Sequence, residues 1–379
     1  MKPIIGEYHA LAQWAMQQCE FSLSYLSREW PDIETWKATA RSKVLELLSY
    51  NPPEVPLNPR VERVVERDGV IVELVSYDQP FGPRTEGYLL YPARRSGRLP
   101  GVVALHDHGG FKFYGKEKLV GLDDEPIVLR EFKRDLYGGR SWANELAKRG
   151  YVVFVPDVFL WGSRKMAVAS FPDAFVKKMS QLESDSSEYI KAYNAMAGQY
   201  ETHIAKVLFL AGTTWPGIAL YDDRRAVDYL VSRDEVDPDR LGCGGLSGGG
   251  FRTIMLAGLD PRIKCAVCVG FMSTYQEMIA DKAASHTWMI HIPHLSKYLD
   301  MPDLASLHAP LPFMCQYDED DALWTLEGQR EADRKLQAVY SKMGRASAYS
   351  GKFYPGPHKF DVNMQEDAFD WFDRWLKDT

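Results

Sequence analysis

Short apolar runs of strand length alternate with stretches of helical length along most of this 379-residue chain. An uninterrupted apolar run of four to eight residues is typical of a strand in a parallel sheet, because helices cover both of its faces. Five such runs begin near residues 99, 151, 239, 264 and 311. Three segments with helical spacing lie between or after them, at 141–150, 222–233 and 365–378. The alternation predicts an α/β fold with a doubly wound, mostly parallel sheet.

The first 60 residues do not follow this alternation. Their apolar residues have helical spacing up to the stretch 51–59, whose prolines cannot continue a helix. Residues 61–78 then alternate with a period of two around Asp68-Gly69, which predicts a β-hairpin, and 86–92 predicts a further strand. We therefore expect an N-terminal helical segment at 1–60 and one α/β domain at 61–379.

Residues 159–220 carry no strand pattern and contain polar helical stretches. The segment is too long for a simple connection between a strand and a helix. It follows the run at 151–157, and folds of this type bind ligands at the carboxyl ends of their strands. The sequence therefore predicts a helical insertion, or lid, at about 159–220 that borders the site and selects the substrate.

The charge and cysteine content exclude several classes of protein. A formal net charge of −7 opposes binding to nucleic acid or to an anionic membrane, because both require a basic face. No stretch approaches the roughly 18 apolar residues of a membrane span. The five cysteines lie mostly in apolar runs, unlike a disulfide framework, and the N-terminus lacks a signal-peptide pattern. We expect a cytoplasmic protein, as a monomer or an oligomer, without nucleic-acid or membrane partners.

Residues 245–249, Gly-Leu-Ser-Gly-Gly, match the motif G-x-S-x-G between a predicted strand and a predicted helix. A sharp turn from strand to helix leaves no room for side chains two positions either side of the corner, which suits Gly245 and Gly249. Ser247 would then stand above the sheet at the positive end of a helix dipole. We predict Ser247 as a nucleophile, although a glycine-rich turn with an incidental serine has the same pattern.

A nucleophilic serine requires a base, and the base an acid that orients it. His358 lies in a Pro/Gly-rich loop between a strand-like run and the last helix, and it is the predicted base. Four acids follow the strand at 311–318 and are candidates for the third group: Asp318, Glu319, Asp320 and Asp321. The order serine, acid, histidine is that of α/β-hydrolases.

The loop after the first buried strand is expected to supply part of an oxyanion hole. Gly109 and Gly110 allow it to turn, so backbone N–H groups of Gly110 and Phe111 would act with that of Gly248. His106 and His108 are expected to brace this loop. Aromatic residues near the loops are candidates for the pocket wall, although each also suits core packing: Phe111, Phe113, Trp161 and Trp288.

Two further patterns predict no metal or redox site. His291 and His294 are spaced like metal ligands, but Pro293 prevents a helical pair and no carboxylate stands at a supporting spacing. Cys265 and Cys268 lie in a predicted strand, where residues three apart point to opposite faces and cannot join. We expect no metal and no cofactor.

Taken together, the quoted motifs resemble the dienelactone hydrolase and acetyl xylan esterase branch of the α/β-hydrolase superfamily. The similarity runs from about Trp36 to the C-terminus, through "GVVALHDHGG", "YVVFVPDVFLWGSR", the glycine-rich motif and "GPHKF". The resemblance implies an α/β-hydrolase fold and a Ser-Asp-His ester hydrolase, with Ser247, Asp321 and His358 as nucleophile, acid and base. The chain departs from this branch at Asp318, where related chains usually have glycine.

These observations predict a serine hydrolase that cleaves a small-molecule carboxylic ester, such as an acetyl ester of a sugar or a lactone. A carbon–carbon bond hydrolase or a peptidase could use the same triad. For a peptidase we would expect a propeller domain and an acidic pair to hold a peptide amine, and neither is evident in the sequence. A ligand-binding relative without activity is disfavoured because all three triad residues are present.

Overall fold

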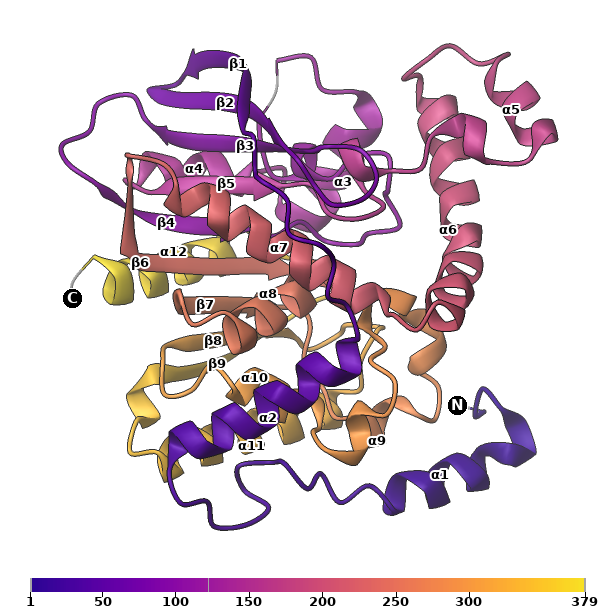
Figure 1. Cartoon of the computed structure of the whole chain (residues 1–379), viewed down its shortest axis with the longest axis vertical. Helices are drawn as coiled ribbons and strands as arrows, with labels where there is room; N and C mark the ends of the chain where they lie inside the picture. The colour runs from indigo at the N-terminus through magenta and orange to yellow at the C-terminus, as the bar shows by residue number, and fades with distance from the viewer. Residues whose placement is uncertain (1, 122, 378–379) are drawn as a thin grey trace.

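The computed structural model describes residues 2–121 and 123–377, and its centre is one mixed sheet (Figure 1). In the described residues the strand order is β1-β2-β3-β5-β4-β6-β7-β8-β9. The strands are β1 (Arg60–Arg67), β2 (Val70–Tyr77), β3 (Thr85–Pro92), β4 (Leu99–Ala104), β5 (Val152–Pro156), β6 (Val236–Leu246), β7 (Ile263–Val269), β8 (Phe313–Asp318) and β9 (Tyr349–Tyr354).

The sheet has an antiparallel part and a parallel part. Strands β1, β2, β3 and β5 pair antiparallel, whereas β5, β4, β6, β7, β8 and β9 are parallel to one another. The predicted hairpin turn joins β1 to β2, and both of its residues have positive φ, 50° at Asp68 and 77° at Gly69. The prediction of an α/β fold with a mostly parallel sheet is confirmed.

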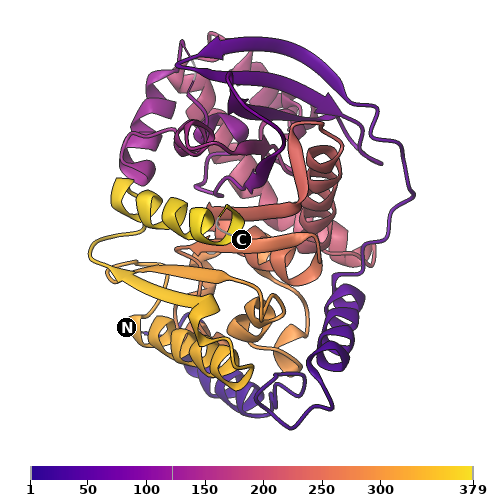
Figure 2. The same ribbon diagram turned by 90° about the vertical axis from the view of Figure 1, so that its left-hand side faces the viewer.

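Helices cover both faces of this sheet. The helices of the described residues are α1 (His9–Gln17), α2 (Ile33–Leu48), α3 (Ile127–Tyr137), α4 (Trp142–Lys148), α5 (Asp173–Met179), α6 (Ser187–Leu210), α7 (Trp215–Val231), α8 (Gly248–Leu259), α9 (Tyr275–Met278), α10 (Met301–Ser306), α11 (Leu326–Lys342) and α12 (Val362–Leu376). The turned view shows α12 on one side of the sheet and α2 on the other (Figure 2). Short 3-10 helices lie in the connections.

Alternate residues of the central strands enter two separate cores. Val103 packs in the larger core with residues of α2, α7 and α8, whereas its neighbours Val102 and Ala104 pack with residues of α4 and α12. Both cores exclude water almost completely, and burial of apolar surface is the main favourable contribution to folding. The strand runs are continuously apolar because each face of the sheet has its own layer of helices.

The predicted N-terminal segment contains α1 and α2. Helix α2 starts at the capping residue Asp32, whose carboxylate accepts a hydrogen bond from the Thr35 N–H at 2.7 Å. Trp36, Val44 and Leu48 of this helix are buried in the larger core. Helix α2 is therefore packed against the α/β part.

The predicted insertion at 159–220 contains α5, α6 and the start of α7. Helices α5 and α6 project to one side of the sheet in Figure 1. A third apolar cluster joins the insertion to the loop after β4 through Phe111, Phe113, Phe171 and Tyr193. In the described residues no single helix could cross a membrane; α6 and α7 together pass by length and composition, but they meet at a bend of 92°.

Candidate active site

Ser247 forms the corner between β6 and α8. Its backbone has φ 59° and ψ −119°, a conformation that non-glycine residues rarely adopt. A Cβ atom on Gly245 or on Gly249 would lie 2.1 Å from the carbonyl oxygen of Leu105, so both positions require glycine. The strained corner and the close approach of the chains are those expected of a strand-to-helix turn that presents a nucleophile.

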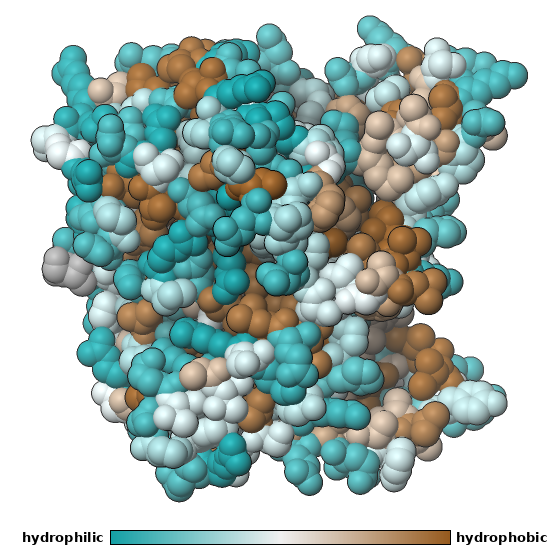
Figure 3. Space-filling view, in the orientation of Figure 1, coloured by the Kyte–Doolittle hydropathy of each residue, from teal (hydrophilic) through white to brown (hydrophobic). Residues whose placement is uncertain are grey.

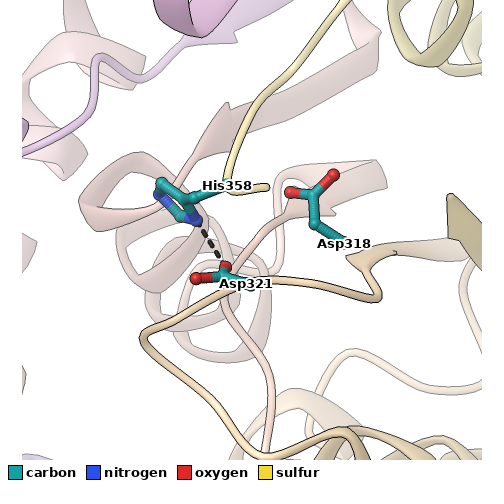
Figure 4. A group of neighbouring side chains, drawn as sticks. All are labelled: Asp318, Asp321 and His358. Carbon is teal, nitrogen blue, oxygen red and sulfur yellow. Dashed lines mark hydrogen bonds and ion pairs between the residues drawn. The ribbon is translucent and has the colours of Figure 1, made fainter. Parts of the chain in front are cut away.

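Asp321 and His358 come from the loops after the adjacent strands β8 and β9. Asp321 Oδ2 lies 2.5 Å from His358 Nδ1, and a dashed line marks this pair in Figure 4. The Leu323 N–H donates to Asp321 Oδ1 at 2.9 Å, so the second oxygen of the carboxylate is also held. Burial opposes the charged imidazole, but the hydrogen bond and negative charge of Asp321 outweigh it and raise the pKa of His358. Of the four candidate acids, Asp321 is the one paired with the histidine.

Ser247 and His358 line the same cavity, whose volume is about 430 Å³. Gly270, with φ 58°, lets the chain pass His358, since a Cβ there would lie 2.9 Å from the imidazole Cε1. The lining contains polar and apolar groups: Asp107, His108, Gly109, Gly110, Leu136, Ser247, Gly248, Phe271, Ser285, His286, Thr287, Ile290, Leu323, Trp324 and His358. The structure therefore brings the serine and the acid-histidine pair to one cavity.

The backbone donors of the loop after β4 differ from those expected. The Gly110 N–H donates to His108 Nδ1 at 3.0 Å, and the Phe111 N–H donates to the His108 carbonyl at 3.1 Å. Both predicted oxyanion donors of this loop are thus occupied, because the positive φ angles of Gly109 and Gly110 turn them back toward His108. Gly110 itself lines the cavity, and its role as an oxyanion donor stays a prediction.

The backbone nitrogen of His108 lies close to Gly248. A Cβ on Gly248 would lie 2.8 Å from His108 N, so this N–H group approaches the residue that follows Ser247. In the described part of the chain no hydrogen bond occupies the N–H of His108 or that of Gly248 at the start of α8. These two groups can together stabilise a negative oxygen above Ser247.

None of the four predicted pocket aromatics is among the described residues that line this cavity. Phe111 and Phe113 are buried in the cluster that joins the insertion to the loop after β4. Trp161 is buried beneath the Lys112 ammonium, which lies 3.4 Å from its ring centroid. Trp288 lines a separate apolar groove of about 400 Å³, beside apolar residues at the end of α6 that Figure 3 shows in brown. The four aromatic side chains therefore pack at other places in the structure and not in the cavity wall.

No described residue of the insertion lines the cavity, but Glu201, which no sequence motif marks, contacts two residues that do. Glu201 of α6 accepts a hydrogen bond from His108 Nε2 at 2.6 Å and one from Thr287 Oγ1 at 2.9 Å, and it pairs with Lys112 at 2.8 Å. Although burial opposes its ionised form, the hydrogen bond from His108 and the charge of Lys112 lower the pKa of Glu201 to about 2. His108 braces its loop, and Glu201 braces His108.

The side chains Asp318, Asp321 and His358 form a group of the type that can bind a metal ion, with one ligand atom of each within 4.8 Å of the others. A cation there would have to displace the pairing of Asp321 with His358. His291 belongs instead to the apolar groove at the end of α6. Cys265 and Cys268 are buried in separate cores on opposite faces of β7.

Comparisons with known proteins agree with this arrangement. A family model described as the prolyl oligopeptidase family matches residues 212–379, a range that includes Ser247, Asp321 and His358. A curated Bacillus subtilis protein, "Putative hydrolase YtaP", is 27% identical over 343 residues, which cover 90% of this chain and 100% of that protein. The relative extends over both the N-terminal segment and the α/β part.

Solved structures show the same fold at lower identity. A "putative acetyl xylan esterase" from Bacteroides fragilis aligns with a TM-score of 0.70 and 17% identity, over 92% of this chain and 82% of that one. A glucuronoyl esterase from Solibacter usitatus aligns with a TM-score of 0.61 and 15% identity, over 93% and 96% of the two chains. The solved structures share the fold of this chain, and the comparisons together show an α/β-hydrolase fold.

Proposed function

We propose that the protein is a serine hydrolase that cleaves a carboxylic ester through Ser247, His358 and Asp321. The observation that carries the proposal is the 2.5 Å pairing of His358 with Asp321 at the cavity that also contains the strained Ser247. A carboxylate on Nδ1 fixes the imidazole tautomer whose Nε2 can accept a proton. The residues and their order are those that acyl transfer through a serine requires.

In this mechanism Ser247 Oγ attacks the ester carbonyl while His358 Nε2 takes the hydroxyl proton. The carbonyl oxygen becomes negative and accepts hydrogen bonds from the N–H groups of His108 and Gly248. His358 then gives its proton to the leaving alcohol, and an acyl group remains on Ser247. Water, activated by the same histidine, releases the acid and restores the serine.

The cavity supports a small ester as the substrate. Its volume of about 430 Å³ lies in the lower range for small-molecule sites. Leu136, Ile290 and Leu323 provide apolar walls, while Ser285 and Thr287 provide hydroxyl groups. Such a lining suits a short acyl group together with an alcohol that carries hydroxyls, and we propose an acetylated sugar, with a lactone as the alternative.

The test compares wild type with Ser247→Ala on aryl esters of increasing acyl length, acetylated sugars and lactones. We expect hydrolysis of the acetyl esters by wild type, fastest for the sugar acetate, and none by the variant at unchanged melting temperature. A serine-reactive fluorophosphonate should label wild type at Ser247 only. Hydrolysis by the variant at the wild-type rate would refute the proposal.

A peptidase is the second candidate, because the matching family model is that of the prolyl oligopeptidases. The same triad can cleave an amide if the leaving amine is protonated by His358. A matched pair of an acyl ester and its amide separates the two candidates. Turnover of the ester alone supports the esterase, whereas comparable kcat/KM values on short peptides ending in an aryl amide would favour the peptidase.

A further inference from the structure

The ester-hydrolase mechanism leaves Asp318, a buried acid beside Asp321 and His358, without a role. Asp318 is the last residue of β8, and its side chain is fully buried. Its Oδ2 accepts a hydrogen bond at 3.0 Å from the N–H of Lys359, the residue directly after the candidate base. Its Oδ1 is buried without a hydrogen-bond partner in the described structure. A buried carboxylate with an unpartnered oxygen is costly, so its retention here requires an explanation.

The surroundings of Asp318 place its charge beside the acid-histidine pair. One oxygen of Asp318, one of Asp321 and one ring nitrogen of His358 all lie within 4.8 Å of one another, and Figure 4 shows the three side chains around one small space. The charged groups that act on Asp318 are His358, Asp321 and Lys359. From α11, the uncharged Gln329 donates to the Asp318 carbonyl at 3.0 Å.

We propose that Asp318 is a positioning residue that acts through His358. It holds the histidine loop by the Lys359 N–H, and its negative charge favours the imidazolium that forms when Ser247 attacks. The inference rests on the proposed ester hydrolysis. It gives the base His358 a second acidic partner, in addition to Asp321.

The protonation of Asp318 makes this role dependent on pH. Burial raises its pKa to about 7, although the Lys359 N–H and the positive charge of His358 act in the opposite direction. Asp318 is therefore neutral in acid and ionised in mild alkali. Since His358 must also lose a proton to act as base, two coupled ionisations precede full activity.

The experiment compares the pH profiles of kcat/KM for wild type and Asp318→Asn on an aryl acetate, with Asp320→Asn as the matched control. Asp320 also holds the histidine loop, since its Oδ2 accepts from the Gly356 N–H at 3.1 Å, but its side chain is exposed. For wild type we expect log(kcat/KM) to rise with a slope that approaches about two in acid. For Asp318→Asn we expect a slope of about one, a midpoint lower by about one pH unit and a plateau about tenfold lower.

A profile of Asp318→Asn that matches those of wild type and Asp320→Asn would overturn the inference. Rates are normalised to serine titrated with the fluorophosphonate, so a fraction of unfolded variant does not alter the profile. If Asp318→Asn does not fold, the His358 ring resonances of wild type are followed by NMR instead. Two titration steps of these resonances near neutral pH support the inference, and a single titration step refutes it.

Ser247→Ala is measured alongside these variants. Activity that survives in Ser247→Ala refutes the proposed ester hydrolysis itself. Loss of activity in Ser247→Ala, together with an unchanged profile in Asp318→Asn, refutes only the role of Asp318.

Discussion

Glu201 of the insertion and His108 of the loop after β4 are joined by a hydrogen bond of 2.6 Å, although 93 residues separate them in the chain. The other oxygen of Glu201 accepts from Thr287 Oγ1 at 2.9 Å, and Thr287 also lines the cavity. One carboxylate thus ties together two walls of the site. Glu201 joins the insertion to these cavity-lining residues, and we expect changes in the insertion to alter substrate preference more than stability.

Glu201→Ala is predicted to lower kcat by about 10- to 100-fold, because a small misplacement of a catalytic group has effects of this size. Without the carboxylate, the imidazole ring of His108 is no longer held in one orientation. The backbone N–H of His108 is then no longer directed at the oxyanion. Steady-state kinetics on an aryl acetate measures the change. Glu188→Ala, at an exposed position in the first turn of α6, is the control and should match wild type. Equal kcat values for the two variants would exclude this role of Glu201.

Asp321→Asn is predicted to lower turnover on the order of 10⁴-fold, the effect known for the equivalent substitution in a serine-protease triad. The amide keeps the shape but favours the wrong imidazole tautomer. Glu319→Gln and Asp320→Asn remove charges from exposed positions of the same loop and should each change kcat less than about threefold. A near-normal rate for Asp321→Asn would show that His358 is oriented by another group.

Gly245→Ala is predicted to destabilise the protein by about 3 kcal/mol, the upper range for overpacking of a core. The added Cβ would lie 2.1 Å from the Leu105 carbonyl oxygen, and both are backbone positions that cannot move independently. Gly198→Ala is the control, since a Cβ at this exposed position in α6 would meet nothing within 4 Å. It should stabilise by about 0.5–1 kcal/mol. Urea unfolding measures both, and equal stability of the two variants would contradict the prediction.

Asp318 is predicted to make the protein less stable as the pH rises. Its pKa is about 7 in the folded state, against an ordinary value of 3.8, so the folded state holds the proton more tightly. The stabilisation is fully present below about pH 4 and is lost as the pH rises through about 7. Asp318→Asn cannot ionise, so its melting temperature should fall less than that of wild type between pH 5 and pH 8. An equal fall in melting temperature for wild type and for Asp318→Asn would disprove the prediction.

The sequence predicted the fold because its signals are local. Apolar runs, helical spacing and the Asp68-Gly69 turn each depend on a few neighbouring residues. The G-x-S-x-G corner is also local, since the positive φ of Ser247 and the flanking glycines belong to one turn. The hydrogen bonds that the N–H groups of Gly110 and Phe111 make to His108 could not be predicted, because the direction of each N–H depends on the φ angles of two glycines. Glu201 was missed because its partners are distant in the chain and no motif marks them.

The strand order has a consequence for how activity is lost. His358 follows β9, which pairs only with β8 at the edge of the described sheet and has mostly half-buried residues, whereas Ser247 follows the interior strand β6. Edge elements open by local fluctuations that leave the rest of a protein folded. Amide hydrogens of β9 should therefore exchange with solvent before those of β6. On heating, catalysis would stop at the first fraying of this edge, while most of the molecule is still folded.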